Sequence, residues 1–197
     1  MKIKFQTLLF ALFVFASCDS NESKKRPSEN FEYILEKSFL RKDTQTWLPS
    51  LEKLVNKETG IYVIYKPGAI PTIKKYKSVA EINDEHTSIG YALMNVNCQM
   101  QKGNFPKFDF NKEAFSSSGC FHKDISGVKI ISETQAEVAE MLGGGFTKKE
   151  RKAASEIDKT ISKILLISDA SLELYFAFSN GKYYLVLIDA AKYDLST

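Results

Sequence analysis

The hydrophobic residues of the N-terminal half recur in two stripes with the 3.6-residue period of an α-helix. The first stripe comprises Phe31, Ile34, Leu35 and Phe39, and the second comprises Trp47, Leu48, Leu51, Leu54 and Val55. This spacing predicts one amphipathic helix over 29–41 and a second helix that begins after Thr46, a suitable N-cap, and ends by Gly60. Pro49 fits the first turn of the second helix, where no hydrogen-bond donor is lost. We expect both stripes to face a core.

The middle of the chain carries shorter apolar runs that favour strands. Gly60–Gly68 places five β-branched or aromatic residues between glycines, which predicts a buried strand. Ile70–Tyr76 follows the Pro-Gly turn and is expected to return as its partner strand. Gly90–Cys98 and Val128–Ile131 are two further predicted strands, whereas Phe105–Ser118 has the composition of a surface loop.

Two sequences of the form Thr-x-x-Glu predict helix starts farther along the chain. Thr134–Glu137 opens a short helix that Gly143 ends, and Thr147–Glu150 opens a longer helix through about Ser162. The three glycines between these helices follow a helix and lack the Lys-Ser/Thr ending of a phosphate-binding loop. We therefore interpret them as a hinge.

The C-terminal part of the sequence predicts a β-hairpin. Leu172–Ser179 and Lys182–Asp189 flank Asn180-Gly181, the dipeptide that favours a two-residue hairpin turn. A regular register pairs Phe178 with Tyr183, Phe176 with Leu185, Leu174 with Leu187, Ala177 with Tyr184 and Tyr175 with Val186. Because both faces of this hairpin are apolar, we expect a helix, a second sheet or a ligand to cover the second face.

The first seventeen residues have the layout of a secretory signal peptide. Two lysines precede the unbroken apolar run Leu8–Phe15, and small residues follow. The run is about half the length that spans a bilayer. Phe15-Ala16-Ser17-Cys18 resembles the lipobox of bacterial lipoproteins, although Phe15 stands where an aliphatic residue is usual. The resemblance implies that Cys18 carries acyl chains such as palmitate and becomes the mature N-terminus.

This N-terminal pattern divides the chain into three parts. We expect a signal peptide over 1–17, a lipidated cysteine and flexible polar tether over 18–30, and a single domain over 31–197. Two or more acyl chains anchor a protein stably. The protein is therefore expected on a membrane of the bacterial envelope, with the outer membrane favoured. The basic triplet 24–26 has acidic neighbours and is interpreted as part of the solvated tether rather than as a headgroup-binding site.

Composition and charge narrow the possible partners. Hydrophobic residues make up 44% and charged residues 26% of the 197 residues, which excludes a disordered chain and a multi-pass membrane protein. The chain has 27 basic and 24 acidic residues, and without Lys2 and Lys4 of the signal peptide 25 basic residues face the same 24 acidic ones. The mature protein is thus nearly neutral, and overall charge gives no reason to expect a nucleic-acid partner.

Cys98 and Cys120 remain once Cys18 carries lipid. Export places them in an oxidising compartment, so we predict a structural disulfide between them. The alternative is that both thiols are free and buried. A zinc site requires closely spaced Cys and His, and only His122 is near. A redox pair would normally show Cys-x-x-Cys, which is absent.

Two segments resemble small envelope lipoproteins of Bacteroidetes and flavobacteria. One segment is Gly60–Ala69, and the other is Gly181–Leu185 followed by Ile188-Asp189. The resemblance implies a lipid-anchored α+β domain, with N-terminal helices packed on a mostly antiparallel sheet that ends in the C-terminal hairpin. It brings no catalytic residues. The order of helices followed by a curved sheet is also loosely similar to the fold of nuclear transport factor 2, although the helix predicted after Thr147 departs from that order.

No motif in the sequence predicts a catalytic centre or a cofactor site. The chain has two histidines, His86 and His122, and lacks nucleophile-elbow, zinc, EF-hand and nucleotide-binding patterns. Asn83–His86 gathers possible metal ligands, but a solvated turn explains it better, and we predict no metal. Asp109 and Asp189 have apolar surroundings, and each is interpreted as a hydrogen-bond acceptor at a strand end rather than as a perturbed acid.

The sequence therefore favours a non-catalytic, lipid-anchored module that binds an envelope protein or a small hydrophobic ligand, or that has a structural role. Tyrosines are the candidate binding residues, and they are Tyr62, Tyr65, Tyr76, Tyr175 and Tyr184. One alternative is an enzyme with a site assembled around His86 or His122. Another is an immunity-type lipoprotein that protects the cell from a secreted toxin.

Overall fold

A computed structural model describes residues 30–40 and 45–194. The helices in this part of the chain are α1 (Phe31–Phe39), α2 (Trp47–Glu52), α3 (Val79–Glu85), α4 (Thr87–Met94), α5 (Ile130–Leu142), α6 (Lys148–Asp158) and the 3₁₀ helix η1 (Ser168–Ala170). The strands are β1 (Ile61–Tyr65), β2 (Thr72–Tyr76), β3 (Met100–Lys102), β4 (Phe108–Asp109), β5 (Ala114–Phe115), β6 (Cys120–Asp124), β7 (Ile161–Ile167), β8 (Leu172–Ser179) and β9 (Lys182–Asp189).

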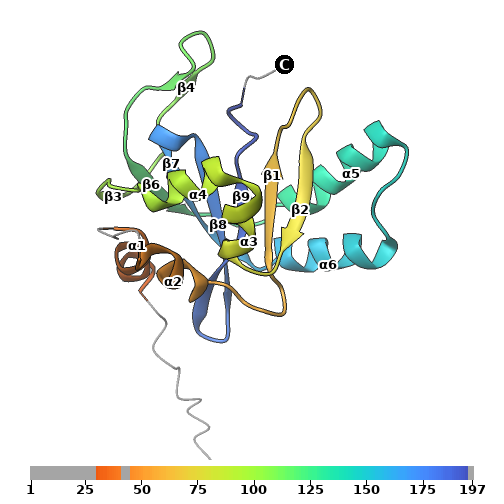
Figure 1. Cartoon of the computed structure of the whole chain (residues 1–197), viewed down its shortest axis with the longest axis horizontal. Coiled ribbons are helices and arrows are strands. Elements are labelled where there is room, and N and C mark those ends of the chain that lie inside the picture. Colours follow the sequence, from red (N-terminus) through yellow and green to blue (C-terminus); the bar gives the residue numbers. More distant parts are fainter. Residues whose placement is uncertain (1–29, 41–44, 195–197) are drawn as a thin grey trace, which may run out of the picture.

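Seven of these strands form one sheet in the order β2-β1-β9-β8-β7-β6-β3 (Figure 1). Most neighbours are antiparallel, and the pairs β1–β9 and β3–β6 are parallel. β4 and β5 form a separate two-stranded sheet within the predicted surface loop. The predicted α+β class, with helices on a mostly antiparallel sheet and a C-terminal hairpin, is confirmed.

The sheet has an apolar core on each face. One core packs the first face against α1, α2, α3 and α4, and the other packs the second face against α5 and α6 (Figure 1). Along β1, Ile61 and Val63 enter the first core, whereas Tyr62 and Ile64 enter the second. This alternation follows from the two-residue period of a strand. The second face of the hairpin is therefore covered by helices, one of the three expected coverings.

The hairpin has the predicted strand limits and turn. Asn180 and Gly181 both have positive φ angles, as a type I′ turn requires. The predicted pairs next to the turn are present, including Phe176 with Leu185. Farther along, the predicted register is wrong, because a bulge changes the partners. The structure pairs Tyr175 with Leu187 and Leu174 with Ile188 instead of Tyr175 with Val186 and Leu174 with Leu187.

Several predicted elements in the first half are confirmed. α1 lies within the predicted helix, and the Asn30 side chain caps it by accepting from the Glu32 N–H at 3.0 Å. β1 and β2 form the predicted antiparallel pair. The second helix is shorter than predicted, since α2 ends at Glu52. Gly60 has a φ of +66° and leads into β1, where a Cβ would overlap the Tyr76 carbonyl.

The strand predicted over Gly90–Cys98 is wrong, because this region forms α4. Gly90 lies inside α4 and faces α3, and a Cβ at this position would overlap the Asn83 side chain. The glycine therefore allows two helices to approach closely. Its presence does not mark the start of a strand.

The strand predicted over Val128–Ile131 is also wrong, because α5 begins at Ile130. The Asp158 carboxylate accepts from the Ile131 N–H at 3.1 Å and from the Ser132 N–H at 2.9 Å, which caps this helix from a distant part of the chain. Thr134 therefore lies within α5 and does not open it, although the predicted end at Gly143 is confirmed by a left-handed C-cap.

α6 begins with the predicted capping box, in which Thr147 and Glu150 satisfy each other's backbone N–H groups. It ends at Asp158, earlier than the predicted end near Ser162. The Thr160 hydroxyl donates to the Ile157 carbonyl at 2.7 Å, so this carbonyl in the last turn of α6 has a hydrogen-bond partner. The apolar residues that follow form β7, which has no strand prediction from the sequence, as is also the case for β3, β4, β5 and β6.

Candidate functional site

A cleft opens where α1, the segment after α2 and the start of β9 meet. Its volume is about 450 Å³, within the range of small-molecule sites. The Leu185 N–H donates to the Leu54 carbonyl at 2.9 Å and fixes the segment after α2 against β9. The lining residues are Tyr33, Ile34, Lys37, Ser38, Ser50, Lys53, Leu54, Lys182, Tyr183 and Tyr184. We call this site the lysine–tyrosine cleft.

Three lysines from three different elements give the cleft its charge. Lys37 belongs to α1, Lys53 follows α2 and Lys182 begins β9. Among the described residues, no Asp or Glu lines the cleft. None of the three lysines forms an ion pair with another residue in the described part of the chain. Within this described part, the cleft therefore carries positive charge that no lining carboxylate offsets, which favours an anionic ligand.

Three tyrosines also line the cleft. Tyr33 is 59% exposed, and the Lys37 ammonium group lies 5.5 Å from the centre of its ring. Tyr183 is held in place by ring contacts with Phe31 at 4.9 Å and Phe178 at 4.7 Å. Tyr184 lines the cleft and also a smaller pocket of about 230 Å³ beside α6. Phenol rings and ammonium groups together can hold a ligand that is both anionic and partly apolar.

The tyrosines named as binding candidates are distributed over several places, and Tyr184 alone among them lines the cleft. Tyr62 and Tyr175 are 5% and 2% exposed and belong to the core beneath α5 and α6. Their rings therefore contribute to this core, and a binding role for Tyr62 and Tyr175 stays a prediction. Tyr65 and Tyr76 pack instead against His86.

His86 forms a compact polar cluster with residues of β1, β2 and α3. Its Nε2 lies 2.6 Å from the Tyr76 hydroxyl, and its ring centre lies 4.3 Å from that of Tyr65. Glu85 binds the Lys74 ammonium group. Burial of the imidazole lowers the pKa of His86, and burial together with the nearby Glu85 raises the pKa of Tyr76.

His122 lies in a different place, beneath the start of α1. It is 2% exposed, its ring centre lies 5.7 Å from that of Phe31, and its Nε2 is 3.8 Å from a carboxylate oxygen of Glu32. Its Nδ1 has no hydrogen-bond partner among the described residues. Burial lowers the pKa of His122. The contacts of His122 and His86 include no common residue, so the histidines do not form one site.

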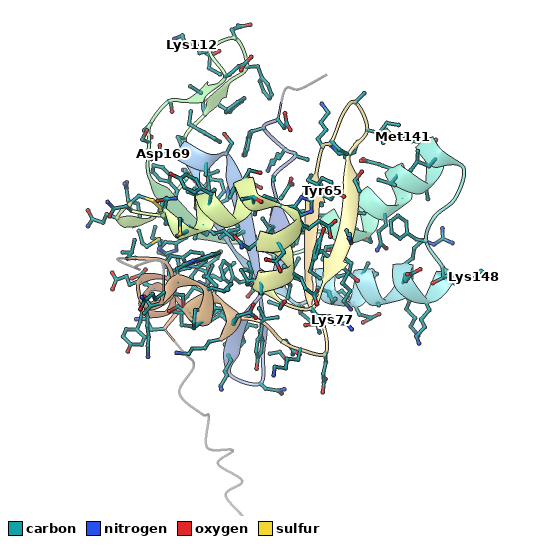
Figure 2. The ribbon with its side chains drawn as sticks, in the orientation of Figure 1. Tyr65, Lys77, Lys112, Met141, Lys148 and Asp169 are labelled. Atoms are coloured by element: carbon teal, nitrogen blue, oxygen red, sulfur yellow. A yellow bond between two sulfur atoms is a disulfide. The ribbon has the colours of Figure 1, made fainter. Side chains whose placement is uncertain are left out.

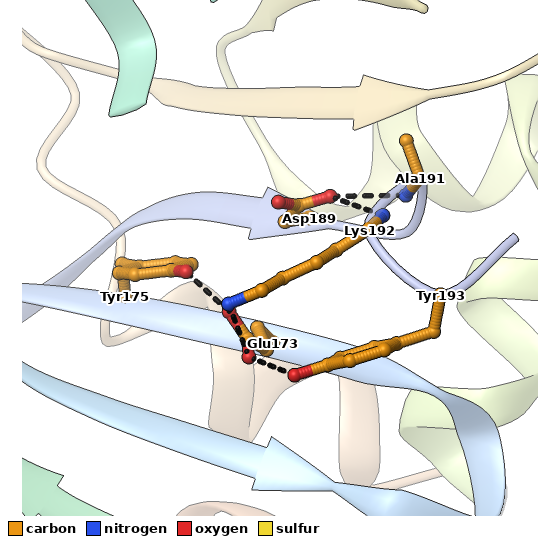
Figure 3. A network of polar contacts seen from close by, with 6 residues as sticks. All are labelled: Glu173, Tyr175, Asp189, Ala191, Lys192 and Tyr193. Atoms are coloured by element: carbon orange, nitrogen blue, oxygen red, sulfur yellow. Dashed lines mark hydrogen bonds and ion pairs between the residues drawn. The ribbon is translucent and has the colours of Figure 1, made fainter. Parts of the chain in front are cut away.

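Two acids from neighbouring strands form a polar network at the end of the sheet where β9 stops (Figure 3). Glu173 has no exposed surface, and its carboxylate accepts from the Tyr175 hydroxyl, from the Lys192 ammonium group at 2.9 Å and from the Tyr193 hydroxyl at 2.6 Å. These bonds tie the segment after β9 to β8. Burial and the nearby Glu173 charge raise the pKa values of Tyr175 and Tyr193.

Asp189 and Asp109 have the predicted role of hydrogen-bond acceptors at strand ends. Asp189 accepts from the N–H groups of Ala191 and Lys192, both at 3.0 Å (Figure 3). Burial raises the pKa of Asp189 even though these two donors oppose the shift. Asp109 accepts from the N–H of Asn111 at 3.0 Å, within the turn that joins β4 to β5.

Asn83–His86 forms the last turn of α3 and its C-cap, whereas a solvated turn is predicted there. Its residues do not converge on a metal position. Across residues 30–40 and 45–194, no group of three or more His, Cys, Asp or Glu side chains has the arrangement of a metal site. The side chains of Glu85 and His86 instead contact Lys74 and Tyr76.

The predicted disulfide between Cys98 and Cys120 is present, with the two Cα atoms 5.5 Å apart. It ties the segment after α4 to the start of β6, and Cys120 is fully buried in the first core. The bond therefore has a structural position.

Cys18, the signal peptide and nearly all of the tether lie outside the described residues. The helices of the described part of the chain are all too short or too polar to cross a bilayer.

The residues that form the lysine–tyrosine cleft had no sequence signal as a group. Lys37 and Lys53 lie on the polar sides of the two predicted N-terminal helices, where lysine is common. Lys182 and Tyr183 belong to the predicted C-terminal hairpin. No family model, curated protein or solved structure matches the chain.

Proposed function

We propose that the protein is a non-catalytic, lipid-anchored binding module of the bacterial cell envelope, and that the lysine–tyrosine cleft is its ligand site. The observation that carries the proposal is the convergence of Lys37, Lys53 and Lys182 on one cleft that no carboxylate of the described residues lines. The signal peptide and the lipobox at Cys18 support the location in the envelope.

The chemistry of the cleft selects the ligand class. Ammonium groups favour phosphate, sulfate or carboxylate, and the rings of Tyr33 and Tyr183 favour a planar or apolar body. The hydroxyls of Ser38 and Ser50 supply further polar contacts. We therefore propose an anionic small molecule with an apolar part, which specifies further the hydrophobic ligand expected from the sequence.

The test uses a probe that combines the two features. Binding of 8-anilinonaphthalene-1-sulfonate, an aromatic sulfonate, is followed by fluorescence in the full chain and in a variant with Lys37→Gln, Lys53→Gln and Lys182→Gln. The expected result is binding at least tenfold weaker in the variant, with the affinity of the unaltered protein falling as salt rises. Equal affinity in the two proteins would contradict the proposal.

A matched variant controls for the loss of three positive charges. Lys102, Lys107 and Lys112 are exposed and are not among the residues that line the cleft; they lie on β3 and around β4 and β5. Their replacement by Gln is expected to leave probe binding within twofold of the unaltered protein. The same three proteins can then be used to capture ligands from envelope extract, and a small molecule enriched on the unaltered and control proteins but not on the cleft variant identifies the natural ligand.

A further inference from the structure

The turn between α5 and α6 exposes two large apolar side chains at the rim of the molecule. Met141 and Leu142 end α5 with exposed fractions of 58% and 64%. Figure 2 shows Met141 and Lys148 at the outer end of the α5–α6 layer, on the far side of the sheet from β3. An apolar pair with this exposure is absent from the rest of α5, whose other large apolar residues are partly or fully buried.

Basic residues flank the apolar pair. The first turn and a half of α6 carries Lys148, Lys149, Arg151 and Lys152, all of them exposed. The acidic residues of the same region are Glu140 and Glu150. The Glu150 carboxylate is occupied by the capping box, where it accepts from the Thr147 N–H at 2.8 Å and from the Thr147 hydroxyl at 2.7 Å. The tip 140–152 therefore has four positive and two negative side chains.

The turn itself can accommodate a new contact. Gly143, Gly144 and Gly145 have φ angles of +71°, +148° and +135°, and nothing lies within 4 Å of the position of a Cβ at any of the three. The turn between the two helices therefore presents bare backbone at these three positions.

We propose that the tip 140–152 is a membrane-contact site that inserts Met141 and Leu142 into an anionic bilayer surface while the lysines and the arginine bind lipid headgroups. Charge complementarity selects this occupant, since exposed apolar residues bordered by basic residues match the apolar interior and the negative surface of such a bilayer. The membrane contact at the tip depends on the anchor proposed at Cys18 in one respect only, namely that the anchor keeps the domain close to the bilayer. The twelve residues 19–30 span at most about 40 Å when extended, which keeps the tip within reach of the membrane.

Hydrogen exchange in the full chain tests the membrane contact. The protein is incubated with vesicles of phosphatidylcholine alone or with 30 mol% phosphatidylglycerol, and exchange of the amides of 140–147 is measured at short times. We expect at least threefold slower exchange on the anionic vesicles than on the neutral ones, and loss of this protection in 0.5 M salt. Equal exchange on the two kinds of vesicle would overturn the proposal.

Two variants separate the apolar and the basic contributions. Met141→Ser with Leu142→Ser is expected to abolish the protection, and Lys148→Gln with Lys149→Gln is expected to weaken binding to anionic vesicles by about tenfold to thirtyfold. Lys102→Gln with Lys107→Gln is the control of equal charge change at exposed positions elsewhere, and should leave the protection unchanged. Protection that persists in both tip variants would refute the assignment.

Failure of the proposed anchor and failure of the proposed membrane contact at the tip give different experimental results. Without an acyl anchor, the protein does not remain with neutral vesicles, yet the tip amides still become protected when anionic vesicles are added. With an anchor but no membrane contact at the tip, the protein stays on both vesicles and the exchange of 140–147 is the same on each. Protection that grows with protein concentration in the absence of vesicles would assign the tip to contact with a second copy and would overturn the membrane proposal.

Discussion

The Glu173 carboxylate is fully buried and accepts hydrogen bonds from three side chains. Among these three donors, Lys192 is the one that carries a positive charge. We expect Glu173→Gln to lower the free energy of unfolding by about 2–4 kcal/mol, because the change leaves a buried amide among donors and leaves the Lys192 ammonium group without its partner. Chemical denaturation followed by circular dichroism measures the difference.

A surface acid provides the comparison for Glu173. Glu156 forms an exposed ion pair with Lys159, three residues along α6. Glu156→Gln is expected to have a much smaller effect than Glu173→Gln, since water solvates both exposed partners. Similar losses from the two variants would show that the Glu173 network does not hold the segment after β9 in place.

The two histidines predict a pH dependence of stability. Burial lowers the pKa values of His86 and His122 below the ordinary value of 6.5, so the unfolded chain takes up protons first as the pH falls. Stability is therefore lost as the pH decreases through 6.5 and toward the lowered values of the folded state. Unfolding free energies at pH 7.5 and 5.5 should show this fall.

His122→Leu should make the decrease in stability smaller, because it removes one of the two groups. The raised pKa of Asp189 acts in the opposite sense, since it favours the folded state as the pH falls through that value. This opposing effect is common to the unaltered protein and the variant, and it cancels in the comparison. An identical decrease in both proteins would contradict the assignment to His122.

At the scale of elements, the disulfide is a connection that can be removed without changing any residue. The bond between Cys98 and Cys120 closes a loop over a separation of 22 residues, for which chain entropy gives a contribution of about 3 kcal/mol. We expect reduction to lower the free energy of unfolding by this amount. In the non-reduced protein, a thiol-reactive mass tag applied under denaturing conditions should leave both cysteines unlabelled, and two labelled cysteines would contradict the pairing.

The sequence predicts elements well where a local signal agrees with the final packing. The hairpin limits, the capping box of α6 and the strand after Gly60 all follow from short patterns of this kind. The strand predicted over residues 90–98 is wrong because Gly90 allows α4 to approach α3 closely. This contact is visible only in the folded structure. Similarly, α5 begins at Ile130 because Asp158 caps it from a distance.

The boundary between α6 and β7 illustrates the limit of periodicity. Neither Gly nor Pro separates Asp158 from Ile161, so the apolar spacing of α6 continues unbroken into the strand. The shifted register beyond Tyr175 has a comparable origin. A bulge adds one residue to β9 without any distinctive residue type, and the regular pairing of the first half of the hairpin could not predict it.

At the scale of the whole molecule, the candidate site was the least predictable feature. Lys37, Lys53 and Lys182 are far apart in sequence, and each alone is an ordinary solvated lysine. Their convergence depends on how α1 and α2 pack beside β9. Of the tyrosines predicted to bind a ligand, Tyr184 lines the cleft, whereas Tyr62 and Tyr175 belong to the second core, because aromatic residues on a sheet with two covered faces mostly belong to its cores.

The lipid anchor proposed at Cys18 concerns the whole molecule, and it predicts that the protein is found in the membrane fraction. We expect intact-mass analysis of the membrane fraction to show a chain that begins at Cys18 and carries acyl groups. Cys18→Ser should move the protein out of that fraction, because no other residue can accept the diacylglycerol in place of the Cys18 thiol. The cleft should retain its affinity for the aromatic sulfonate probe in this variant, and an unmodified Cys18 in the mature chain would refute the anchor.

The position of β9 affects when the protein can fold. β9 lies between β1 and β8, and Tyr62 pairs with Leu187, 125 positions farther along the chain. Until the ribosome has added residue 189, β1 lacks its central neighbour and neither core can close. Synthesis therefore yields an incompletely folded polypeptide for most of its duration, and the native structure forms only after the last strand arrives.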